Sequence, residues 1–446
     1  MKERWTEISP DACEKQEALF HKAMEPVGIS FENEEAEEAY RKRFEIIKDA
    51  IQFNKIPERI PVWLTASAFP LEYTGTTWKD AMYDYDKLAS AYEKYTADFP
   101  ESDVLAAGGG IISGRMLDIL DFKLCLWAGH GLADDREYQY IEKDFLQAGE
   151  YRDFIDDPTG WILNVYFPRI FGALDGFKNF PIPLAINEIM FIPALTIPFA
   201  SPPLSSAVDK LLEAGRETAK WADKIGRLSM TLKKKGYIAV GGSSAKAPFD
   251  VLGDTLRGTR EIMMDLFRRP DEVIEACERI LPLMVKAGIR GSINGNFCFI
   301  PLHKGADGFM SEEHFRTFYW PTLRKLAIGL IDQGIVPLLF AEGSYDSRLD
   351  IISDLPRGKV IWHFDKTDMK RAKETVGKNS CIMGNVPLDL LCAGTPDEVK
   401  EYCRMLIDTA GKDGGYIFAT GAGMQCVKAE NIKAMMHFVK EYGIYK

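Results

Sequence analysis

Three side chains able to bind a metal or move a proton, Glu342, His363 and Asp365, stand at the ends of two short apolar runs. The runs VPLLFA (336–341) and KVIWHF (359–364) are typical of strands, and the DSRLDIISDL segment between them has a helical period. Parallel strands joined by a helix end at the same edge of a sheet, so we expect the three side chains to lie near one another. We predict that they are the catalytic residues.

Further polar residues follow neighbouring predicted strands and should face the same edge. They divide into a pair after the NFCFIPL run, a pair in the helical segment that could orient a carboxylate or a phenol, and an amide after CIMG. We predict that these residues bind substrate: His303 and Asp307, Tyr345 and Arg348, and Asn385.

Structural roles remain open for the same side chains. Glu342 could accept hydrogen bonds from loop amides, and His363 could be a buried, neutral histidine. Asp365 could cap the helix that follows it, although Thr367 and Asp368 compete for that position. Cys426, in the loop after the last predicted strand, could be an unreactive thiol.

The elements that position these residues alternate regularly. Eight strand patterns separated by helices extend from about residue 57 to the end of the sequence, which predicts a (β/α)8 TIM barrel. Helix starts at Ser311 and at Thr395 support this assignment, because Glu398 completes a capping box with Thr395. A doubly wound open sheet is the alternative, but no GxGxxG turn follows the first strand.

Two segments fall outside the alternation. Residues 1–56 predict a helical extension packed on the barrel, with a dimerisation or docking helix as the alternative, so a homodimer remains open. The stretch of about 110–205 is aromatic and rich in proline, as in FIPALTIPFASPPL, and prolines interrupt helices. We predict that it is an insertion that folds over the barrel mouth, within a barrel domain of residues 57–446.

Composition excludes several classes of function. The formal net charge is −11, whereas binding to nucleic acid or to an anionic membrane requires clustered lysine and arginine. Neither an apolar signal core nor an apolar run of membrane-spanning length occurs, and we expect a cytoplasmic protein. The eight cysteines form no CxxC pair and read as reduced core residues.

Four stretches of the chain resemble the uroporphyrinogen decarboxylase superfamily. They are the first strand–helix–strand unit from RIPVWLTASAFPLEY to ESDVL, the central HKGADGFMSEEHFRTFYWPTLRK, the later CIMGNVPLDLLCAGTPDEVKEY, and GGYIFATGAGMQCVKAENIKAM near the end. Members that decarboxylate porphyrinogens carry an Arg-Gln-Ala-Gly-Arg segment after the first strand. Here that region is TASAFPLEY, without an arginine for the substrate acetates.

The resemblance therefore favours the branch of corrinoid-dependent methyltransferases, in which a zinc ion activates a substrate or a thiol. Thiol-activating members use a His-x-Cys pair and a Gly-Cys as ligands, whereas this chain has His363-Phe364-Asp365 and Gly421-Ala422. Members similar to O-demethylases use an acid–acid–His pattern. Its second acid and its histidine match Glu342 and His363, while its first acid falls on Ala327.

The resemblance thus implies a zinc site made by Glu342 and His363 with Asp365 or Cys426. We predict an enzyme of anaerobic metabolism that moves a methyl group from a small, methoxylated aromatic substrate to the cobalt of a separate corrinoid protein. The departing oxygen must be protonated or bound to a metal. A metal-independent decarboxylase or lyase, and a barrel retained only for binding, are the alternatives.

Overall fold

The computed structural model describes residues 4–24, 28–181, 188–240, 243–291 and 297–445. The predicted strand residues Gly241, Gly242 and Asn296, and part of the predicted insertion, lie outside these ranges.

A closed ring of eight parallel strand positions confirms the predicted barrel. Five strands are paired in the order β10-β9-β8-β7-β6, and β1 pairs with β5. Parallel bridges join the two sheets: Val62 with Phe418 of the last strand, Trp63 with Val104, and Ser244 with Phe299. The barrel strands are β1 (Val104–Ala106), β5 (Ile238–Val240), β6 (Phe297–Leu302), β7 (Val336–Ala341), β8 (Ile361–Phe364), β9 (Cys381–Met383) and β10 (Tyr416–Ile417).

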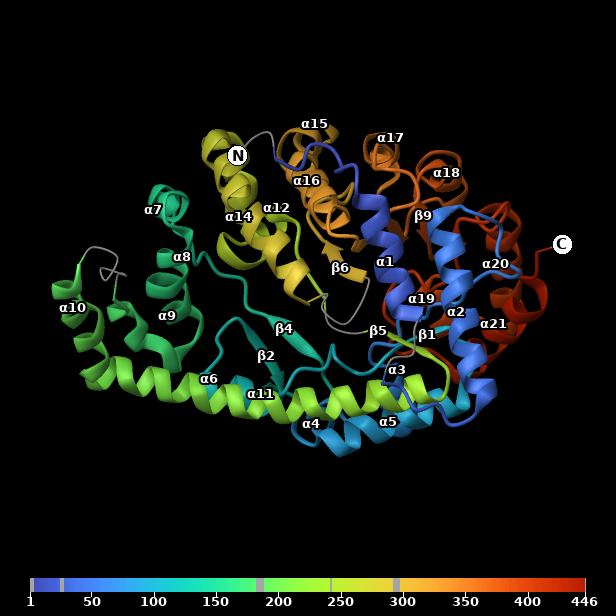
Figure 1. Cartoon of the computed structure of the whole chain (residues 1–446), viewed down its shortest axis with the longest axis horizontal. Coiled ribbons are helices and arrows are strands. Elements are labelled where there is room, and N and C mark those ends of the chain that lie inside the picture. Colours follow the sequence, from blue (N-terminus) through green and yellow to red (C-terminus); the bar gives the residue numbers. More distant parts are fainter. Residues whose placement is uncertain (1–3, 25–27, 182–187, 241–242, 292–296, 446) are drawn as a thin grey trace.

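The helices cover the outside of this ring (Figure 1). Between the barrel strands run α3 (Phe69–Thr74), α4 (Trp78–Tyr83), α5 (Tyr85–Asp98), α12 (Pro248–Asp250), α13 (Thr259–Arg268), α14 (Pro270–Gly291), α15 (Glu312–His314), α16 (Trp320–Ile331), α17 (Leu349–Ile352), α18 (Met369–Glu374), α19 (Leu388–Ala393) and α20 (Pro396–Thr409). The helix α21 (Ala429–Tyr442) follows the last strand. The predicted caps are confirmed, because Ser311 accepts the N–H of His314 and Thr395 forms a capping box with Glu398.

The N-terminal helices α1 (Ala12–Met24) and α2 (Glu34–Gln52) pack against the barrel interior. Phe20, Phe44 and Ile47 share a buried cluster with inward-facing strand residues such as Val336 and Ile361. Because these strand residues stand at the starts of their strands, the two helices close the end of the barrel opposite the mouth.

The segment that follows β1 has two parts. A small sheet of β2 (Cys125–Ala128), β3 (Gly131–Leu132) and β4 (Tyr138–Tyr140) is followed by α7 (Tyr151–Asp156), α8 (Pro158–Trp161), α9 (Phe167–Ile170) and α10 (Ile192–Thr196). The long helix α11 (Pro202–Lys234) then returns to the barrel, and α6 (Gly114–Leu120) packs along it. In Figure 1, α10 stands at the far end of α11, well away from the barrel.

Candidate active site

A charged pair stands at the mouth of the barrel after β6. The Nδ1 atom of His303 lies 2.5 Å from Oδ2 of Asp254. Lys246 Nζ lies 2.7 Å from the same oxygen, and Lys304 Nζ lies 3.2 Å from Oδ1. One carboxylate thus gathers an imidazole and two ammonium groups at the edge where barrel enzymes hold their reactive groups.

These contacts change the proton affinities of both members of the pair. Burial alone would lower the pKa of His303, but the hydrogen bond to Asp254 and its charge outweigh burial and raise that pKa above 6.5. Burial opposes ionisation of Asp254, yet His303 and Lys246 hold the pKa of this carboxyl well below its usual range. The contacts therefore favour the protonated form of the His303 imidazole, whose Nε2 points away from Asp254.

A second carboxylate fixes the position of this pair. Asp250 is fully buried and accepts the backbone N–H groups of His303 at 3.0 Å and Lys304 at 2.9 Å. The Tyr319 hydroxyl donates to it at 2.7 Å. Asp254 follows four residues later, in a π-helical turn that spans Val251–Leu256. Such turns are frequent at functional sites.

Glu342 stands beside the free nitrogen of His303. Its Oε2 is 3.4 Å from Nε2, and its side chain is 55% exposed. The strands β6 and β7 pair through Leu302 and Ala341, which places His303 and Glu342 side by side after the last ladder pair. The structure thus brings together two residues that were predicted separately, one for substrate binding and one for catalysis.

His363 lies apart from this pair, deeper in the barrel. It is 2% exposed, and its Nε2 lies 2.8 Å from the backbone oxygen of Thr420. Burial lowers its pKa to about 4. The side chain is thus a neutral imidazole that donates to a carbonyl group, which agrees with the structural role left open for it by the sequence. In the part of the chain described, no hydrogen bond or ion pair joins His363 to Glu342.

The four predicted zinc ligands do not converge. Asp365 accepts the Gly343 N–H at 3.0 Å, and burial raises the pKa of its carboxyl. Cys426 is exposed beside Glu72 of α3, with its backbone N–H 2.8 Å from that carboxylate. Across the described ranges, no three His, Cys, Asp or Glu side chains are grouped closely enough to hold a metal ion. These residues do not fit the predicted zinc site.

Three residues predicted to bind substrate instead support the loop that carries Glu342. Tyr345 is fully buried and donates to Leu302 O at 3.2 Å. Arg348 is 1% exposed and donates to the carbonyl groups of Gly305 and Met310. Asp307 accepts the hydroxyls of Ser344 at 2.8 Å and Ser347 at 2.7 Å. Their polar atoms are used within the protein, so the structure gives Tyr345 and Arg348 a supporting role, and their contact with substrate stays a prediction from the sequence.

Asn385 is 4% exposed and donates from Nδ2 to Thr367 O at 2.7 Å. Its Oδ1 is buried and accepts no hydrogen bond from the described residues. Asp368, and not Asp365, caps the helix α18.

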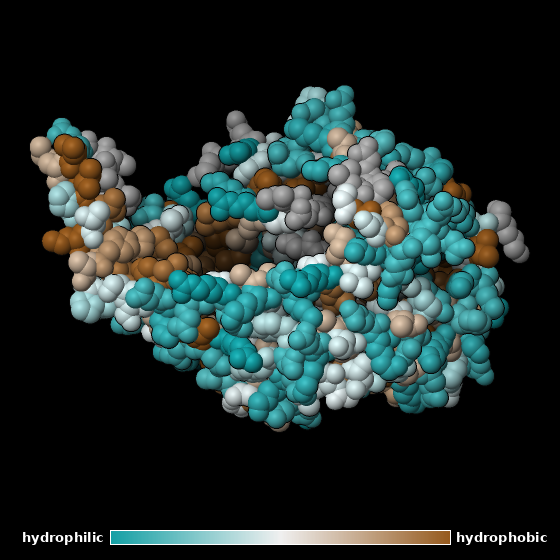
Figure 2. Space-filling model, turned by 60° about the horizontal axis from the view of Figure 1, so that its bottom comes forward, coloured by the Kyte–Doolittle hydropathy of each residue, from teal (hydrophilic) through white to brown (hydrophobic). Residues whose placement is uncertain are grey.

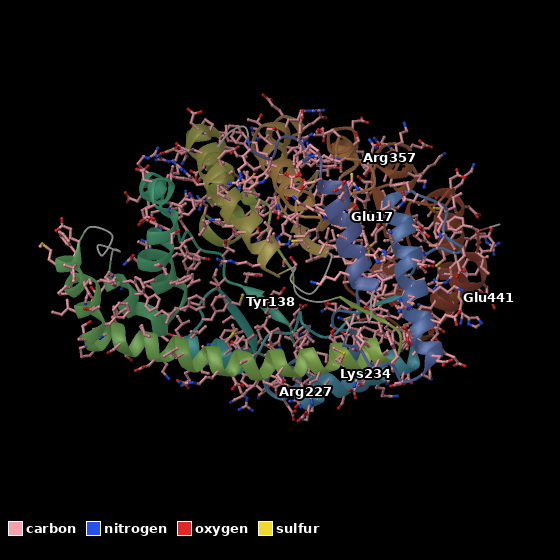
Figure 3. The ribbon with its side chains drawn as sticks, in the orientation of Figure 1. Glu17, Tyr138, Arg227, Lys234, Arg357 and Glu441 are labelled. Carbon is pink, nitrogen blue, oxygen red and sulfur yellow. The ribbon has the colours of Figure 1, made fainter. Side chains whose placement is uncertain are left out.

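Aromatic side chains surround the charged pair. Phe299 of β6 is 39% exposed, and its ring stacks at 6.1 Å on Phe340 of β7. From β4, Tyr138 and Tyr140 are 50% and 56% exposed. Burial raises the pKa of Tyr138 to about 12, with smaller contributions from charges that include Glu342. Figure 3 shows Tyr138 near the centre of the molecule, far from α10. The small sheet therefore supplies an aromatic border to the mouth.

Comparison with known proteins identifies the family. The model of the uroporphyrinogen decarboxylase (URO-D) family matches residues 192–442, which is more than half of the chain. The chain belongs to this family. A uroporphyrinogen decarboxylase of Syntrophotalea carbinolica is 26% identical over 117 residues, which are 26% of this chain and 33% of that protein. The chain thus matches only about a third of the length of this relative.

A solved structure, a methyltransferase from Methanosarcina mazei, shares the fold with a TM-score of 0.58. The match covers 91% of this chain and 98% of that one at 14% identity. The same fold therefore occurs in a methyltransferase, and the side chains at the mouth must decide which reaction this chain supports.

The URO-D family chain holds functional candidates that the sequence patterns did not reveal. Asp250, Asp254, Lys246 and Tyr319 were not predicted, and neither was the contact made by Lys304. One signal was present: Asp250 and Asp254 are four residues apart in the helical segment that comes after the third barrel strand, so a single helical turn presents both at the mouth.

Proposed function

We propose that this protein is a methyltransferase that takes a methyl group from a small methoxylated aromatic compound and that His303 protonates the departing oxygen. The observation that carries the proposal is the 2.5 Å contact of His303 with Asp254, which favours the protonated imidazole and leaves Nε2 beside the exposed Glu342 at the mouth. An alkoxide or phenoxide is a poor leaving group, and a positioned general acid typically contributes about 10²- to 10⁴-fold in rate.

The surroundings of His303 suit such a substrate. Phe299, Phe340, Tyr138 and Tyr140 offer ring faces and edges to an aromatic compound. Glu342, half exposed and 3.4 Å from Nε2, is the side chain that a substrate oxygen would displace to accept the proton. Asp254 would stabilise the imidazolium before transfer and hold its orientation.

The methyl acceptor in this proposal is a corrinoid carried by a separate partner protein, which supplies a strongly nucleophilic cobalt. The exposure of Glu342, Tyr138 and Tyr140 supports access to the mouth from outside. No step of the proposal runs through zinc. The place of the reaction within anaerobic metabolism, and the cytoplasm as its location, stay predictions from the sequence.

The test combines the full chain, a reduced corrinoid protein and a panel of methoxyarenes, with release of the phenol as the measurement. We expect turnover by the wild type and a loss of about 10²- to 10⁴-fold in His303→Asn. His437→Asn is the matched control, because that side chain is 73% exposed and pairs only with Glu441 in the part of the chain described. Full activity of His303→Asn would overturn the assignment of the acid.

Decarboxylation on the same barrel is the second candidate, and membership in the URO-D family favours it. The same imidazolium would then protonate the carbon left by CO₂. The predicted acid–base pair of His363 and Asp365 does not support this reaction, because His363 is buried and neutral. Release of CO₂ from aromatic acids without any corrinoid protein would favour this candidate over methyl transfer.

A further inference from the structure

A buried hydroxyl group stands behind the charged pair at the barrel mouth. Tyr319 ends the π-helical turn Phe315–Tyr319 and is fully buried, and its hydroxyl donates to Oδ2 of Asp250 at 2.7 Å. The same oxygen accepts the backbone N–H of His303 at 3.0 Å, while Oδ1 accepts that of Lys304 at 2.9 Å. One carboxylate therefore joins the tyrosine to the segment that carries His303.

The ionised form of Asp250 is the one that suits these three hydrogen bonds. A protonated carboxyl group turns one of its oxygens into a donor, and a backbone N–H offers such a donor no acceptor. Burial and the charge of Asp254 raise the pKa of Asp250, whereas His303 and the Tyr319 hydroxyl act in the opposite direction. Tyr319 thus favours the form of Asp250 that holds the His303 backbone.

The same tyrosine packs beside the loop that carries Glu342. A methyl group built on Gly305 would stand 2.7 Å from Cε1 of Tyr319 and 2.7 Å from the hydroxyl oxygen of Tyr345, so both rings lie against this glycine. Tyr345 belongs to the loop after β7, and Gly305 to the loop after β6. Tyr319 therefore supports both loops, at whose start Nε2 of His303 and Oε2 of Glu342 are 3.4 Å apart.

We propose, on the basis of the function proposed for His303, that Tyr319 is a positioning residue for the proton transfer and acts through Asp250. A general acid must lie about 2.6 to 3.2 Å from the atom that it protonates, so a small displacement of His303 slows the chemical step. Tyr319 is buried behind the acid and does not line the open mouth. Loss of its hydroxyl should therefore lower kcat and leave KM nearly unchanged.

The exposed apolar surface of the insertion lies apart from Tyr319 and Asp250. Side chains such as Ile189 and Ile197 gather on the projection around α10, which stands clear of the body in Figure 2. The helices Ile189–Ala200 and Pro202–Lys234, bent by 75°, together have the length and composition of a membrane span, whereas no single helix among the described residues does. In the part of the chain described, no side chain of α10 donates a hydrogen bond to the segment that carries His303.

The first test is Tyr319→Phe in the full chain, assayed with a reduced corrinoid protein and methoxyarenes. The substitution keeps the ring that packs on Phe249 and Phe315 and removes only the hydroxyl. We expect kcat to fall by about 10-fold, because a displacement of about 1 Å can cost up to about 10²-fold in rate. An unchanged kcat in the folded variant would overturn the proposal.

Tyr151→Phe is the matched control, because it removes the same kind of bond elsewhere. The buried hydroxyl of Tyr151 donates to the buried carboxylate of Asp265 at 2.8 Å. Across the described ranges, no hydrogen bond or ion pair joins either residue to His303 or Asp254. Both tyrosine variants should lower the melting temperature, but Tyr151→Phe should keep the kcat of the wild type.

A double-variant cycle tests whether the tyrosine acts through the carboxylate. Asp250→Asn keeps the shape of the side chain and removes its charge, so it should lower kcat at least as much as Tyr319→Phe. Because the two residues act as a unit, Tyr319→Phe should cause little further loss in the Asp250→Asn protein. Losses that multiply would show that Tyr319 acts independently of Asp250 and would overturn the proposal.

A spectroscopic measurement does not depend on turnover. Carbon-13 labelling gives one Cε1 signal for each of the six histidines, and His303→Asn identifies the signal of His303. At constant pH, Tyr319→Phe should shift or broaden this signal, whereas Tyr151→Phe should not; an unmoved signal would overturn the proposal. Absence of turnover by the wild type would instead overturn methyl transfer, and the His303 signal would still decide the role of Tyr319.

Discussion

His303 and His363 show how two histidines of one barrel acquire opposite properties. His303 follows β6, and His363 lies within β8, on the other side of β7 in the same parallel sheet. His303 lies beside the carboxylate of Asp254, whereas the ring of His363 packs on Phe340 and its hydrogen-bond partner is a carbonyl oxygen. The first pKa is raised, and the second is lowered to about 4. Of the two, His303 is therefore the one whose protonated form is favoured, so it is the better proton donor.

The pH dependence of activity follows from the Asp254 contact. A raised pKa keeps His303 protonated to higher pH, so kcat/KM of the wild type should fall on an alkaline limb above pH 6.5. Asp254→Asn removes the opposite charge and should move that limb to lower pH by about 1 to 3 units. A pH–rate profile of both proteins measures the shift, and an unmoved limb would show that another group delivers the proton.

His363 should instead make stability depend on pH. Its pKa is about 4 in the folded state and close to 6.5 in the unfolded state, so the unfolded chain binds more protons between these values. Stability should therefore fall as pH drops from 6.5 to 4, by up to about 3 kcal/mol from this group. Denaturant titrations at both pH values should show a smaller loss in His363→Asn; an equal loss would refute the prediction.

The sequence patterns located Glu342 and His303 at one edge of the sheet but did not reveal the side chains that contact them. Strand patterns are visible in apolar runs such as VPLLFA, so the ends of the strands, and with them Glu342 and His303, could be located. Burial cannot be read in this way. Tyr345 and Arg348 are as polar in the sequence as surface residues, yet both are buried by contacts with carbonyl groups far along the chain.

At the scale of elements, Arg257 connects the border of the mouth to the barrel. It is 1% exposed and donates from Nε to Asp265 of α13 at 2.6 Å. It also binds Asp144 and the carbonyl group of Leu146, in the segment that follows β4. This guanidinium group thus links the segment that follows the small sheet to α13.

Breaking this connection should be costly. Arg257→Met leaves the buried carboxylate of Asp265 without its cation, a change that typically destabilises a protein by about 3 to 5 kcal/mol. The double variant Arg257→Met/Asp265→Leu removes both charges and should recover part of the loss. Denaturant unfolding measures both; a single variant as stable as the wild type would contradict the role assigned to Arg257.

The elements around the mouth were harder to predict than the barrel. The helices and strands of the barrel show clear periods of apolar residues in the sequence. In contrast, β2, β3 and β4 contain only two to four residues each, and β4 carries exposed aromatic side chains. Such short strands lack the alternation that identifies a half-buried sheet. The sequence did not reveal the π-helical turn of Asp254 for a similar reason, because its six residues are too few to show a helical period.

At the scale of the whole molecule, a buried carboxylate holds the ring of strands together. Asp103 is 1% exposed and stands before β1. It accepts two hydrogen bonds from Arg59, at 2.8 and 2.6 Å, and the N–H of Val62 at 2.8 Å. Arg43 of α2 approaches it at 3.5 Å. The first strand position, the start of β1 and the helix α2 are therefore joined through the carboxylate of Asp103.

Loss of Arg59 should weaken the entire barrel. We expect Arg59→Met to destabilise the protein by about 3 kcal/mol, at the lower end for a buried pair because the Arg59 side chain is 27% exposed. Arg227→Met is the matched control, since its pair with Asp223 on α11 is exposed and should contribute almost nothing. Chemical denaturation compares the two, and similar stabilities would contradict the prediction.

The bridge between Val62 and Phe418 has a consequence for synthesis of the protein. More than 350 residues separate the two partners, so a ribosome must deliver nearly the whole polypeptide before the ring can close. Until then, Val62 and Trp63 lack their partner Phe418 in the last strand, and the apolar interior of the unfinished barrel remains exposed to water. The nascent chain should therefore remain sensitive to proteases and attractive to chaperones until translation is almost finished.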